Sequence, residues 1–124
     1  AIYTTYSDDK GKTWSTPKEI PEVDGLPPHL MVHSSGAVIC SYVCRTSGHR
    51  SERAVVSYDN GETWTEDYVL DHRVRGYPDM GYPCTVELKD GALLTVYYQP
   101  HPETAHPCVQ YAKWRLNNKA LLND

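Results

Sequence analysis

An eight-residue pattern that occurs twice constrains the fold of this chain more than any other feature of its sequence. The segments 7–14 and 57–64 both read Ser-x-Asp-x-Gly-x-Thr-Trp, at an offset of 57 − 7 = 50 residues. A longer segment, residues 28–42, has a pattern of residue types that recurs in residues 83–97, at an offset of 83 − 28 = 55. Repetition at this period indicates an array of similar units rather than one irregular domain.

Each unit predicts a meander of four antiparallel strands. The expected strands are runs rich in apolar and β-branched residues that turn residues separate. In the first full unit they span residues 28–33, 37–42, 53–57 and 67–70, and in the next unit residues 82–88, 92–98 and 108–113. Four-stranded units of about 50 residues are typical of propeller blades. We therefore expect an all-β fold, a partial β-propeller of about two and a half blades.

The chain is expected to be one part of a larger propeller. Its first residues, 1–6, alternate like a strand and show neither an initiator Met nor a signal peptide. The expected blade remnants are residues 1–26, 27–81 and 82–124. An isolated arc would leave open strand edges, so further blades from upstream chain or from other copies are expected partners. The sequence leaves localisation undecided, and a secreted or periplasmic parent is compatible with it.

Composition argues against several classes of function. The net charge of −4 is the opposite of the basic excess typical of nucleic-acid binders. Apolar runs are far shorter than the ~20 residues of a membrane helix, so no membrane span is expected. The six His and the four Cys show no metal-ligand spacing, and we expect no metal and no cofactor. Free thiols are favoured over disulfides for Cys40, Cys44, Cys84 and Cys108.

The two eight-residue motifs resemble the Asp boxes of sialidases and related propellers. Their residues are Ser7, Asp9, Gly11, Thr13 and Trp14 in the first copy, and Ser57, Asp59, Gly61, Thr63 and Trp64 in the second. In such a box the Ser and Asp side chains bond amides of their own turn and the Gly takes a backbone position that a Cβ would hinder, while the Trp packs between blades. The role expected for both boxes is structural.

The segment 79–99 resembles the last active-site blade of sialidases, where a Tyr opens the inner strand. On this match Tyr82 falls on the catalytic nucleophile, while Pro83 and Gln99 replace the Ser and Glu of the sialidase pattern. The resemblance implies a six-bladed propeller and a retaining exo-glycosidase that removes terminal sialic acid or a related acidic sugar from glycoconjugates. Its general acid and the base of the Tyr would lie upstream of Ala1, so the chain alone is expected to be inactive.

Two arginines are candidates for binding the substrate carboxylate. Arg53 lies 29 positions before Tyr82, close to the spacing of the third arginine in the sialidase triad, and Arg45 precedes it on the same loop. Because strands in a meander alternate in direction, every second connection emerges at the same end of the sheet. By this rule both arginines lie at the same end of the sheet as Tyr82. A planar guanidinium can donate two parallel hydrogen bonds to a carboxylate.

The remaining polar residues of that end have weaker assignments. Candidates for the rim of a sugar pocket are Asp79, Gln99, His49 and His101. Surface ion pairs are expected for Arg50, Arg73 and Arg75. Two alternatives stay open: a non-catalytic Asp-box propeller that binds glycans or proteins, and a glycosidase or lyase of the same fold that acts on another acidic sugar.

Overall fold

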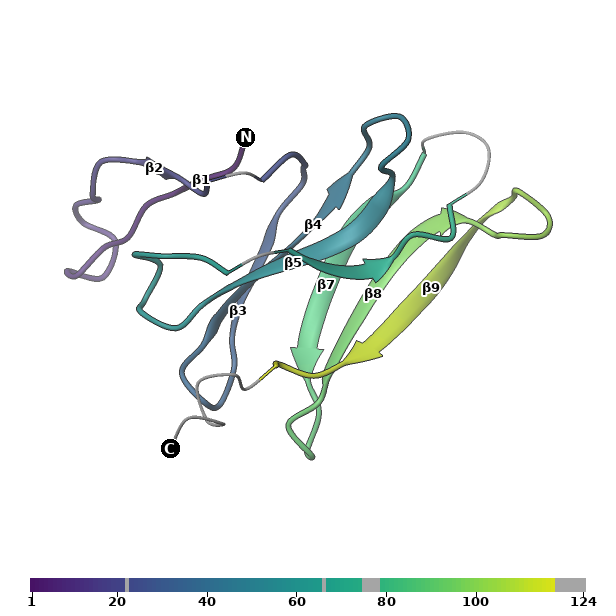
Figure 1. Cartoon of the computed structure of the whole chain (residues 1–124). Helices are drawn as coiled ribbons and strands as arrows, with labels where there is room; N and C mark the ends of the chain where they lie inside the picture. Colours follow the sequence, from purple (N-terminus) through teal and green to yellow (C-terminus); the bar gives the residue numbers. More distant parts are fainter. Residues whose placement is uncertain (22, 66, 75–78, 118–124) are drawn as a thin grey trace.

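The computed structural model describes residues 1–21, 23–65, 67–74 and 79–117, and this part of the chain is all-β (Figure 1). Its nine strands form three antiparallel sheets, and the described residues contain no helix. The first sheet pairs β1 (Tyr3–Thr4) with β2 (Lys18–Glu19). The second is a meander of β3 (His29–Val32), β4 (Val38–Cys44), β5 (Ser51–Ser57) and β6 (Tyr68–Asp71). The third contains β7 (Gly81–Glu87), β8 (Leu93–Pro100) and β9 (Pro107–Trp114).

The seven strands predicted for the two repeat units are confirmed, with ends that differ by at most two residues. The largest differences are two residues: β4 and β8 continue past their predicted ends, and β5 begins before its predicted start. At the start of the chain, only Tyr3–Thr4 of the strand-like residues 1–6 pairs as a strand. Sequence alternation therefore located the long strands well and overestimated the first one.

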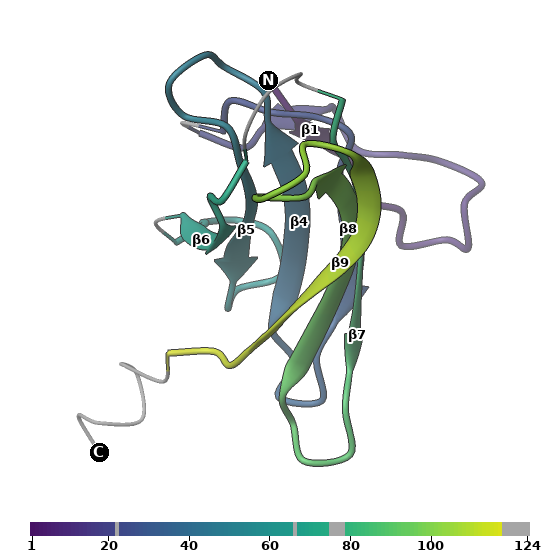
Figure 2. The same cartoon turned by 90° about the vertical axis from the view of Figure 1, so that its right-hand side faces the viewer.

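The three sheets stack side by side, with the β3–β6 sheet in the middle (Figures 1 and 2). One apolar cluster joins the middle sheet to the first sheet and contains Ile2, Ile20, Val23, Cys40, Tyr42 and Val55, with Trp64 packed against it. A second cluster joins it to the third sheet and includes Ile39, Ala54, Val56 and Leu93, with Trp114 packed against it. Strands β4 and β5 are covered on both faces, which explains their nearly continuous burial.

Both Asp boxes form the predicted turn. In the first box the Oδ1 of Asp9 accepts hydrogen bonds from Ser7 Oγ and from the amide of Thr13, each at 2.8 Å. Ser7 Oγ accepts from the amide of Gly11 at 2.8 Å, and Gly11 has a φ of +82°, which favours glycine. The second box repeats these three contacts at the same 2.8 Å distances. The hydrogen bonds expected within each box are thus present in the structure.

The tryptophans of the two boxes differ in their surroundings. Trp64 is half-buried against the cluster between the first and middle sheets. Trp14 stands at the equivalent position of the first box and is 62% exposed. Within the described residues, Trp64 therefore packs between two sheets and Trp14 does not.

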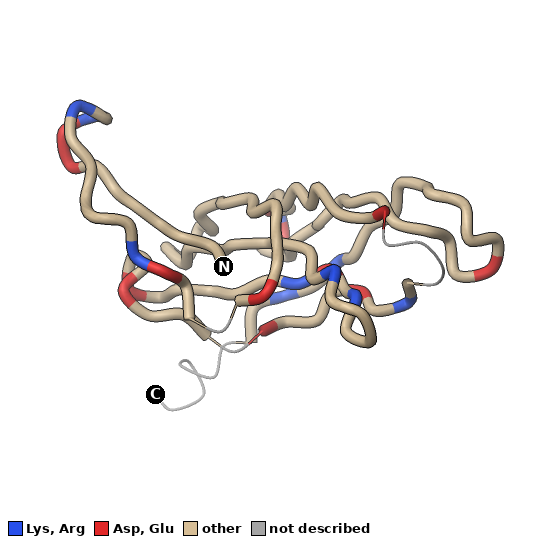
Figure 3. Tube along the Cα trace, turned by 90° about the horizontal axis from the view of Figure 1, so that it is seen from above, with Lys and Arg blue, Asp and Glu red and all other residues tan. Residues whose placement is uncertain are grey.

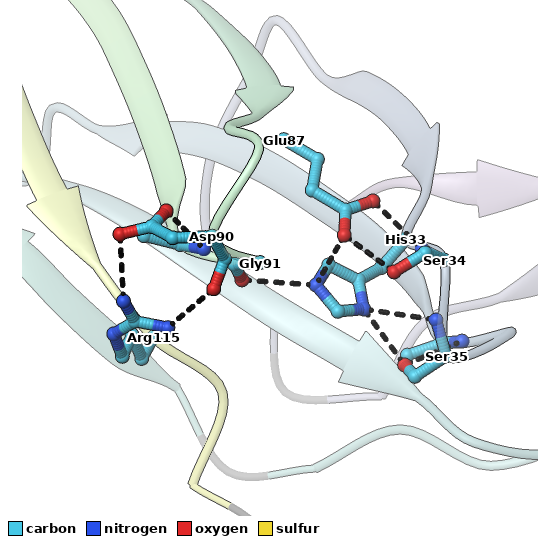
Figure 4. Close-up of polar contacts among 9 residues, drawn as sticks. His33, Ser34, Ser35, Glu87, Asp90, Gly91 and Arg115 are labelled. Carbon is cyan, nitrogen blue, oxygen red and sulfur yellow. Dashed lines mark hydrogen bonds and ion pairs between the residues drawn. The ribbon is translucent and has the colours of Figure 1, made fainter.

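Polar contacts join the middle and third sheets at the turns β3–β4 and β7–β8 (Figure 4). Glu87 accepts hydrogen bonds from the amide and the hydroxyl of Ser34, at 2.7 and 2.5 Å. The Nε2 of His33 lies 3.1 Å from a Glu87 oxygen and 3.1 Å from the carbonyl of Gly91. These bonds lower the pKa of Glu87, with the Ser34 hydroxyl as the strongest cause. We call this the lower end of the stack.

The opposite, upper end carries the connections β4–β5, β6–β7 and β8–β9 (Figure 1). Seen from above, basic and acidic positions are interspersed along the trace as a whole (Figure 3). The four cysteines are free thiols, with Cys40 and Cys44 buried, Cys84 exposed and Cys108 half-buried. Within the described ranges no helix is long and apolar enough to cross a membrane.

Candidate functional site

Tyr82 lies at the start of β7 in an unusual backbone conformation. Its φ is +52°, a region that non-glycine residues rarely adopt, and it directly precedes a proline. The pairing of β7 with β8 is irregular between Gly81 and Cys84, the interval that contains Tyr82. Tyr82 is 66% exposed. Such conformations persist where neighbouring contacts hold them, and they are enriched at functional sites.

The ring of Tyr82 packs on a second tyrosine. Tyr82 and Tyr98 are stacked, with ring centroids 5.9 Å apart and planes at 16°. The hydroxyl of Tyr98 donates a hydrogen bond to the carboxylate of Asp79, and this bond raises the pKa of Tyr98. Tyr98 therefore contacts Asp79 through its hydroxyl and Tyr82 through its ring.

Arg45 connects the β4–β5 loop to the start of β7. Its Nε and Nη2 donate to the carbonyl of Met80 at 3.1 and 2.8 Å. Close approach is possible because Gly81 follows: a Cβ there would lie 2.7 Å from Val43 Cγ1 and 3.3 Å from Arg45 Nη2. The φ of Gly81 is +128°, which also favours glycine. We call Arg45, Asp79, Tyr82 and Tyr98 the upper patch.

A buried acidic residue, Asp71, holds the strands beside this patch together. Its Oδ2 accepts hydrogen bonds from the hydroxyl of Tyr97 at 2.7 Å and from Gln99 Nε2 at 2.9 Å. Arg73 pairs with both carboxylate oxygens, at 3.0 and 2.8 Å. Burial opposes ionisation of Asp71, but the bonds from the side chain and amide of Arg73 and from Tyr97 lower its pKa to about 2.

Glu52 is the cross-strand partner of Asp71, and its pKa shifts in the opposite direction. It is fully buried, and neither of its carboxyl oxygens has a hydrogen-bond partner among the described residues. Burial first, and then the charge of Asp71, raise its pKa to about 8, although the charge of Arg45 acts in the other direction. At neutral pH Glu52 is therefore mostly protonated, while Asp71 is ionised.

Arg53 does not belong to the upper patch. It is paired across the strands with Tyr42 and shares a face of β5 with Val55, which packs toward the first sheet. Its Nη1 donates to Asp67 at 2.9 Å and its Nε to Ser51 at 2.7 Å. The third sheet, which carries Tyr82, packs on the opposite face. The structure therefore separates Arg53 from Tyr82, contrary to the expectation that they line one site.

Arg53 lies instead in a separate shallow cleft. The cleft has a volume of about 190 Å³, and its lining includes Tyr42, Thr46, His49, Arg53 and Asp67. Tyr42 donates a hydrogen bond to the Asp67 carboxylate, and burial together with this carboxylate raises the pKa of Tyr42. With its guanidinium paired to Asp67, Arg53 supports the β5–β6 connection.

The other predicted rim residues are divided between the surface and the interior. Asp79 is exposed and belongs to the upper patch, and His49 is exposed beside Arg53. Gln99 is fully buried against Asp71, so its assignment to a rim is wrong. His101 is half-buried in the β8–β9 loop, where its Nδ1 accepts from the amide of Glu103 at 3.2 Å.

The arginines assigned to surface ion pairs also differ among themselves. Arg73 forms the expected ion pair, with Asp71 as its partner. Arg50 is half-buried, and Arg75 lies outside the described residues. Among the residues that the structure describes, no cluster of His, Cys, Asp and Glu could hold a metal ion.

Sequence reasoning missed the burial of Glu52 and Asp71. One signal was present in the sequence. Glu52, Ala54 and Val56 are alternate residues of one strand, so Glu52 shares the face on which Ala54 and Val56 pack into the core. Comparison of the chain with protein-family models, with curated proteins and with solved structures gave no match. The function must therefore be argued from the geometry of the upper end.

Proposed function

We propose that this chain is the C-terminal part of a sialidase-like β-propeller, and that its upper end binds and hydrolyses a glycan that ends in sialic acid or another acidic sugar. The observation that carries the proposal is the contact of Arg45 with the carbonyl of Met80, which brings a guanidinium to the start of the strand that carries the exposed Tyr82.

The arrangement of the sheets supports the propeller part of the proposal. A four-stranded meander is stacked between two further sheets, and an Asp box follows the third strand of the middle one. The third sheet presents a second, uncovered face with the exposed residues Val86, Val96, Val109 and Tyr111. A further blade packed on this face would continue the stacking seen between the middle and third sheets.

Arg45 is the residue to which the proposal assigns the substrate carboxylate. Its contacts with Met80 use Nε and one N–H of Nη2, so within the described part of the chain Nη1 and the second N–H of Nη2 remain for the two oxygens of a carboxylate. A planar guanidinium binds a carboxylate through parallel hydrogen bonds, and a fixed side chain loses less freedom when it does so. Arg53 is excluded from this role, because its guanidinium is paired with Asp67 on the other face of the sheet.

Tyr82 is the candidate nucleophile. A sugar whose anomeric carbon bears a carboxylate repels an anionic attacking group, so a phenol that loses its proton during attack is better suited than a carboxylate. The stacked Tyr98 would hold the Tyr82 ring, and the exposed face of the ring would meet the sugar. The base that accepts the proton would come from upstream blades, because no carboxylate of the described residues bonds the Tyr82 hydroxyl.

The same observation favours one alternative, a propeller that binds acidic glycans without cleaving them. In that case Arg45 and the tyrosine stack would suffice, since aromatic rings and arginine bind sugars and carboxylates without any base.

The test is hydrolysis of a fluorogenic α-sialoside by the longer protein that includes the upstream blades. We expect activity in the unmodified protein, and a loss of at least about 100-fold in kcat for Tyr82→Phe, because the phenol oxygen is the attacking atom. Binding of the sialoside without turnover would replace the hydrolase by the non-catalytic alternative. Absence of both binding and turnover would contradict the proposal.

A further inference from the structure

Two clefts adjoin at the upper end of the stack, one lined by Arg45 and the other by Arg53. The Arg45 cleft has a volume of about 280 Å³, and its lining includes Asp24, Leu26, Val43, Arg45 and Thr46. The Arg53 cleft has a volume of about 190 Å³ and is lined in part by the same Asp24 and Thr46. The two clefts therefore share a wall, and a ligand long enough to cross this wall would reach both of them.

The shared wall is held by hydrogen bonds from both of its sides. Thr46 Oγ1 donates to Asp24 Oδ2 at 2.6 Å, which joins the segment before β3 to the β4–β5 loop. The amide of Leu26 donates to the carbonyl of Val43 at 3.1 Å, and the amide of His49 donates to the carbonyl of Thr46 at 2.9 Å. Because these bonds form without a ligand, a glycan that binds here loses little affinity to ordering of the wall.

The Arg53 cleft offers polar groups without an excess of positive charge. Arg53 donates from Nε to Ser51 and from Nη1 to Asp67, so among the described residues its Nη2 is left to donate to a ligand. The Asp67 carboxylate, at 2.9 Å, balances the charge of the guanidinium. Asp24 adds an acceptor on the shared wall, and His49 adds an exposed ring. This mixture suits the hydroxyls of a neutral sugar, and its two carboxylates repel a second acidic one.

The sizes of the clefts fit two linked sugar units better than one. Ligand clefts commonly have volumes of about 300–1,000 Å³. Neither cleft reaches this range alone, whereas the two together do. Arg45 forms no ion pair with a described residue, and both of its printed side-chain bonds go to a backbone carbonyl. Its charge is therefore available to the acidic unit of such a ligand.

We propose that the two clefts are adjoining subsites for one glycan: the Arg45 cleft takes the acidic sugar, and the Arg53 cleft takes the neutral sugar linked to it. This assignment rests on the function proposed for the upper patch, and it adds the unit on the far side of the glycosidic bond. Arg53 Nη2, the His49 ring and Asp24 Oδ1 contact hydroxyls of the neutral sugar. The preferred ligand is thus a sialoside whose acidic sugar is linked to a neutral hexose.

The experiment measures Kd calorimetrically for the longer protein that includes the upstream blades, in a Tyr82→Phe background so that the ligand is not cleaved. One ligand is methyl α-sialoside, which reaches only the Arg45 cleft. The other is α-sialyl-galactose, used as its two natural linkage isomers. We expect one isomer to bind about three- to tenfold more tightly than methyl α-sialoside, because the galactose adds one or two hydrogen bonds.

The second subsite is tested by His49→Ala and by Arg53→Lys, since both residues line the Arg53 cleft and neither lines the Arg45 cleft. We expect each variant to remove the gain from galactose and to change the Kd of methyl α-sialoside by less than about twofold. Arg45→Lys should weaken both ligands. The matched control is His72→Ala, an exposed histidine of the same end that lines neither cleft, and it should change neither Kd.

Each contrary result has a separate meaning. Sialyl-galactoses that bind no more tightly than methyl α-sialoside, or a gain that survives both His49→Ala and Arg53→Lys, would overturn the second subsite and leave the proposed function standing. A larger gain for an α-linked disialoside would show that the second unit is acidic, contrary to the proposal. Failure of every ligand to bind the protein would contradict the proposed function, and the two subsites with it.

Discussion

Two neighbouring carboxyl groups, Glu52 and Asp71, show how strongly single residues depend on their partners in this molecule. They are cross-strand partners in β5 and β6, and both are buried. Asp71 receives hydrogen bonds from Arg73, Tyr97 and Gln99, and its pKa falls to about 2. Glu52 has no such donors among the described residues, and its pKa rises to about 8.

The raised pKa of Glu52 predicts a loss of stability at alkaline pH. The ordinary pKa of 4.5 applies to the unfolded chain, so between pH 4.5 and about 8 the folded state holds a proton that the unfolded state releases. Stability due to this group is therefore full below pH 4.5 and falls as pH rises toward 8. Glu52→Gln should raise the free energy of unfolding by on the order of 2–4 kcal/mol at pH 9.

At pH 4 the same substitution should change little, because Glu52 is then protonated in both states. Urea unfolding of both proteins at pH 4, 7 and 9 measures the difference. A Glu52→Gln variant that is less stable than the unmodified chain at pH 9 would mean that Glu52 is ionised and paired in the folded protein.

The Asp boxes predict the opposite dependence on pH. Hydrogen bonds from the side chain and the amide of Thr63 are the main causes that lower the pKa of Asp59 from 3.8 to about 2. The box therefore stabilises the fold above pH 3.8, and this contribution is lost as pH falls toward 2. Asp59→Asn should lower Tm by a few degrees at pH 6, because an amide nitrogen cannot accept the Thr63 hydroxyl.

The difference between Asp59→Asn and the unmodified chain should shrink at pH 2, and thermal melts at both pH values measure it. The matched control is Asp8→Asn, which changes an exposed carboxylate at the variable second position of the first box. A similar loss of Tm in both variants would show that net charge, rather than the box, is responsible.

The sequence predicted the boxes in detail and missed the buried acidic pair for the same physical reason. All box contacts join residues two to four positions apart, so the motif itself determines them. The environment of Glu52 depends on Asp71, 19 residues later, and on Gln99, 28 residues after that, through strand pairing and sheet packing. No local pattern contains that information.

At the scale of elements, β4 and β5 determine how the three sheets are arranged, because each of these strands is buried on both faces. Sequence alternation could locate these strands but not the direction of each side chain, since both faces of β5 carry apolar residues. Arg53 was therefore assigned to the same site as Tyr82, whereas the register places it with Tyr42 on the opposite face. Arg45 follows the last residue of β4, so the direction of that strand alone determines at which end of the sheet Arg45 lies. Arg45 does contact the start of β7.

The segment before β3 packs tightly on β4 and gives a prediction at this scale. A Cβ at Gly25 would lie 2.4 Å from the carbonyl oxygen of Val43 and 2.3 Å from the ring of Tyr42. The backbone cannot yield without moving β4, so Gly25→Ala should lower the free energy of unfolding by about 2–4 kcal/mol. Urea unfolding monitored by circular dichroism measures this.

Gly48→Ala serves as the control for Gly25→Ala. Gly48 has a φ of +85°, and a Cβ added there would meet no atom within 4 Å, so only backbone strain of about 1 kcal/mol is expected. Equal losses in the two variants would indicate that the segment before β3 does not rest on β4 as described.

At the scale of the whole molecule, the two ends of the three stacked sheets carry different sets of polar residues. The lower end holds the turns that His33 and Glu87 join, and the upper end holds the upper patch (Figures 1 and 4). Parity of strand direction predicted this division from the sequence, because it needs only the number and order of the strands. The choice between Arg45 and Arg53 for the proposed carboxylate site required the register, which parity does not supply.

The central claim, that the upper patch binds the carboxylate of an acidic sugar, is tested most directly by titrating the longer protein with methyl α-sialoside and measuring Kd calorimetrically. The account predicts that Arg45→Lys weakens binding about tenfold, because the charge remains and the bidentate geometry is lost. Arg53→Lys, with thermal melts to confirm folding, should change Kd by less than about twofold. Equal effects of the two substitutions, or a larger effect at Arg53, would contradict the assignment of the site to the upper patch.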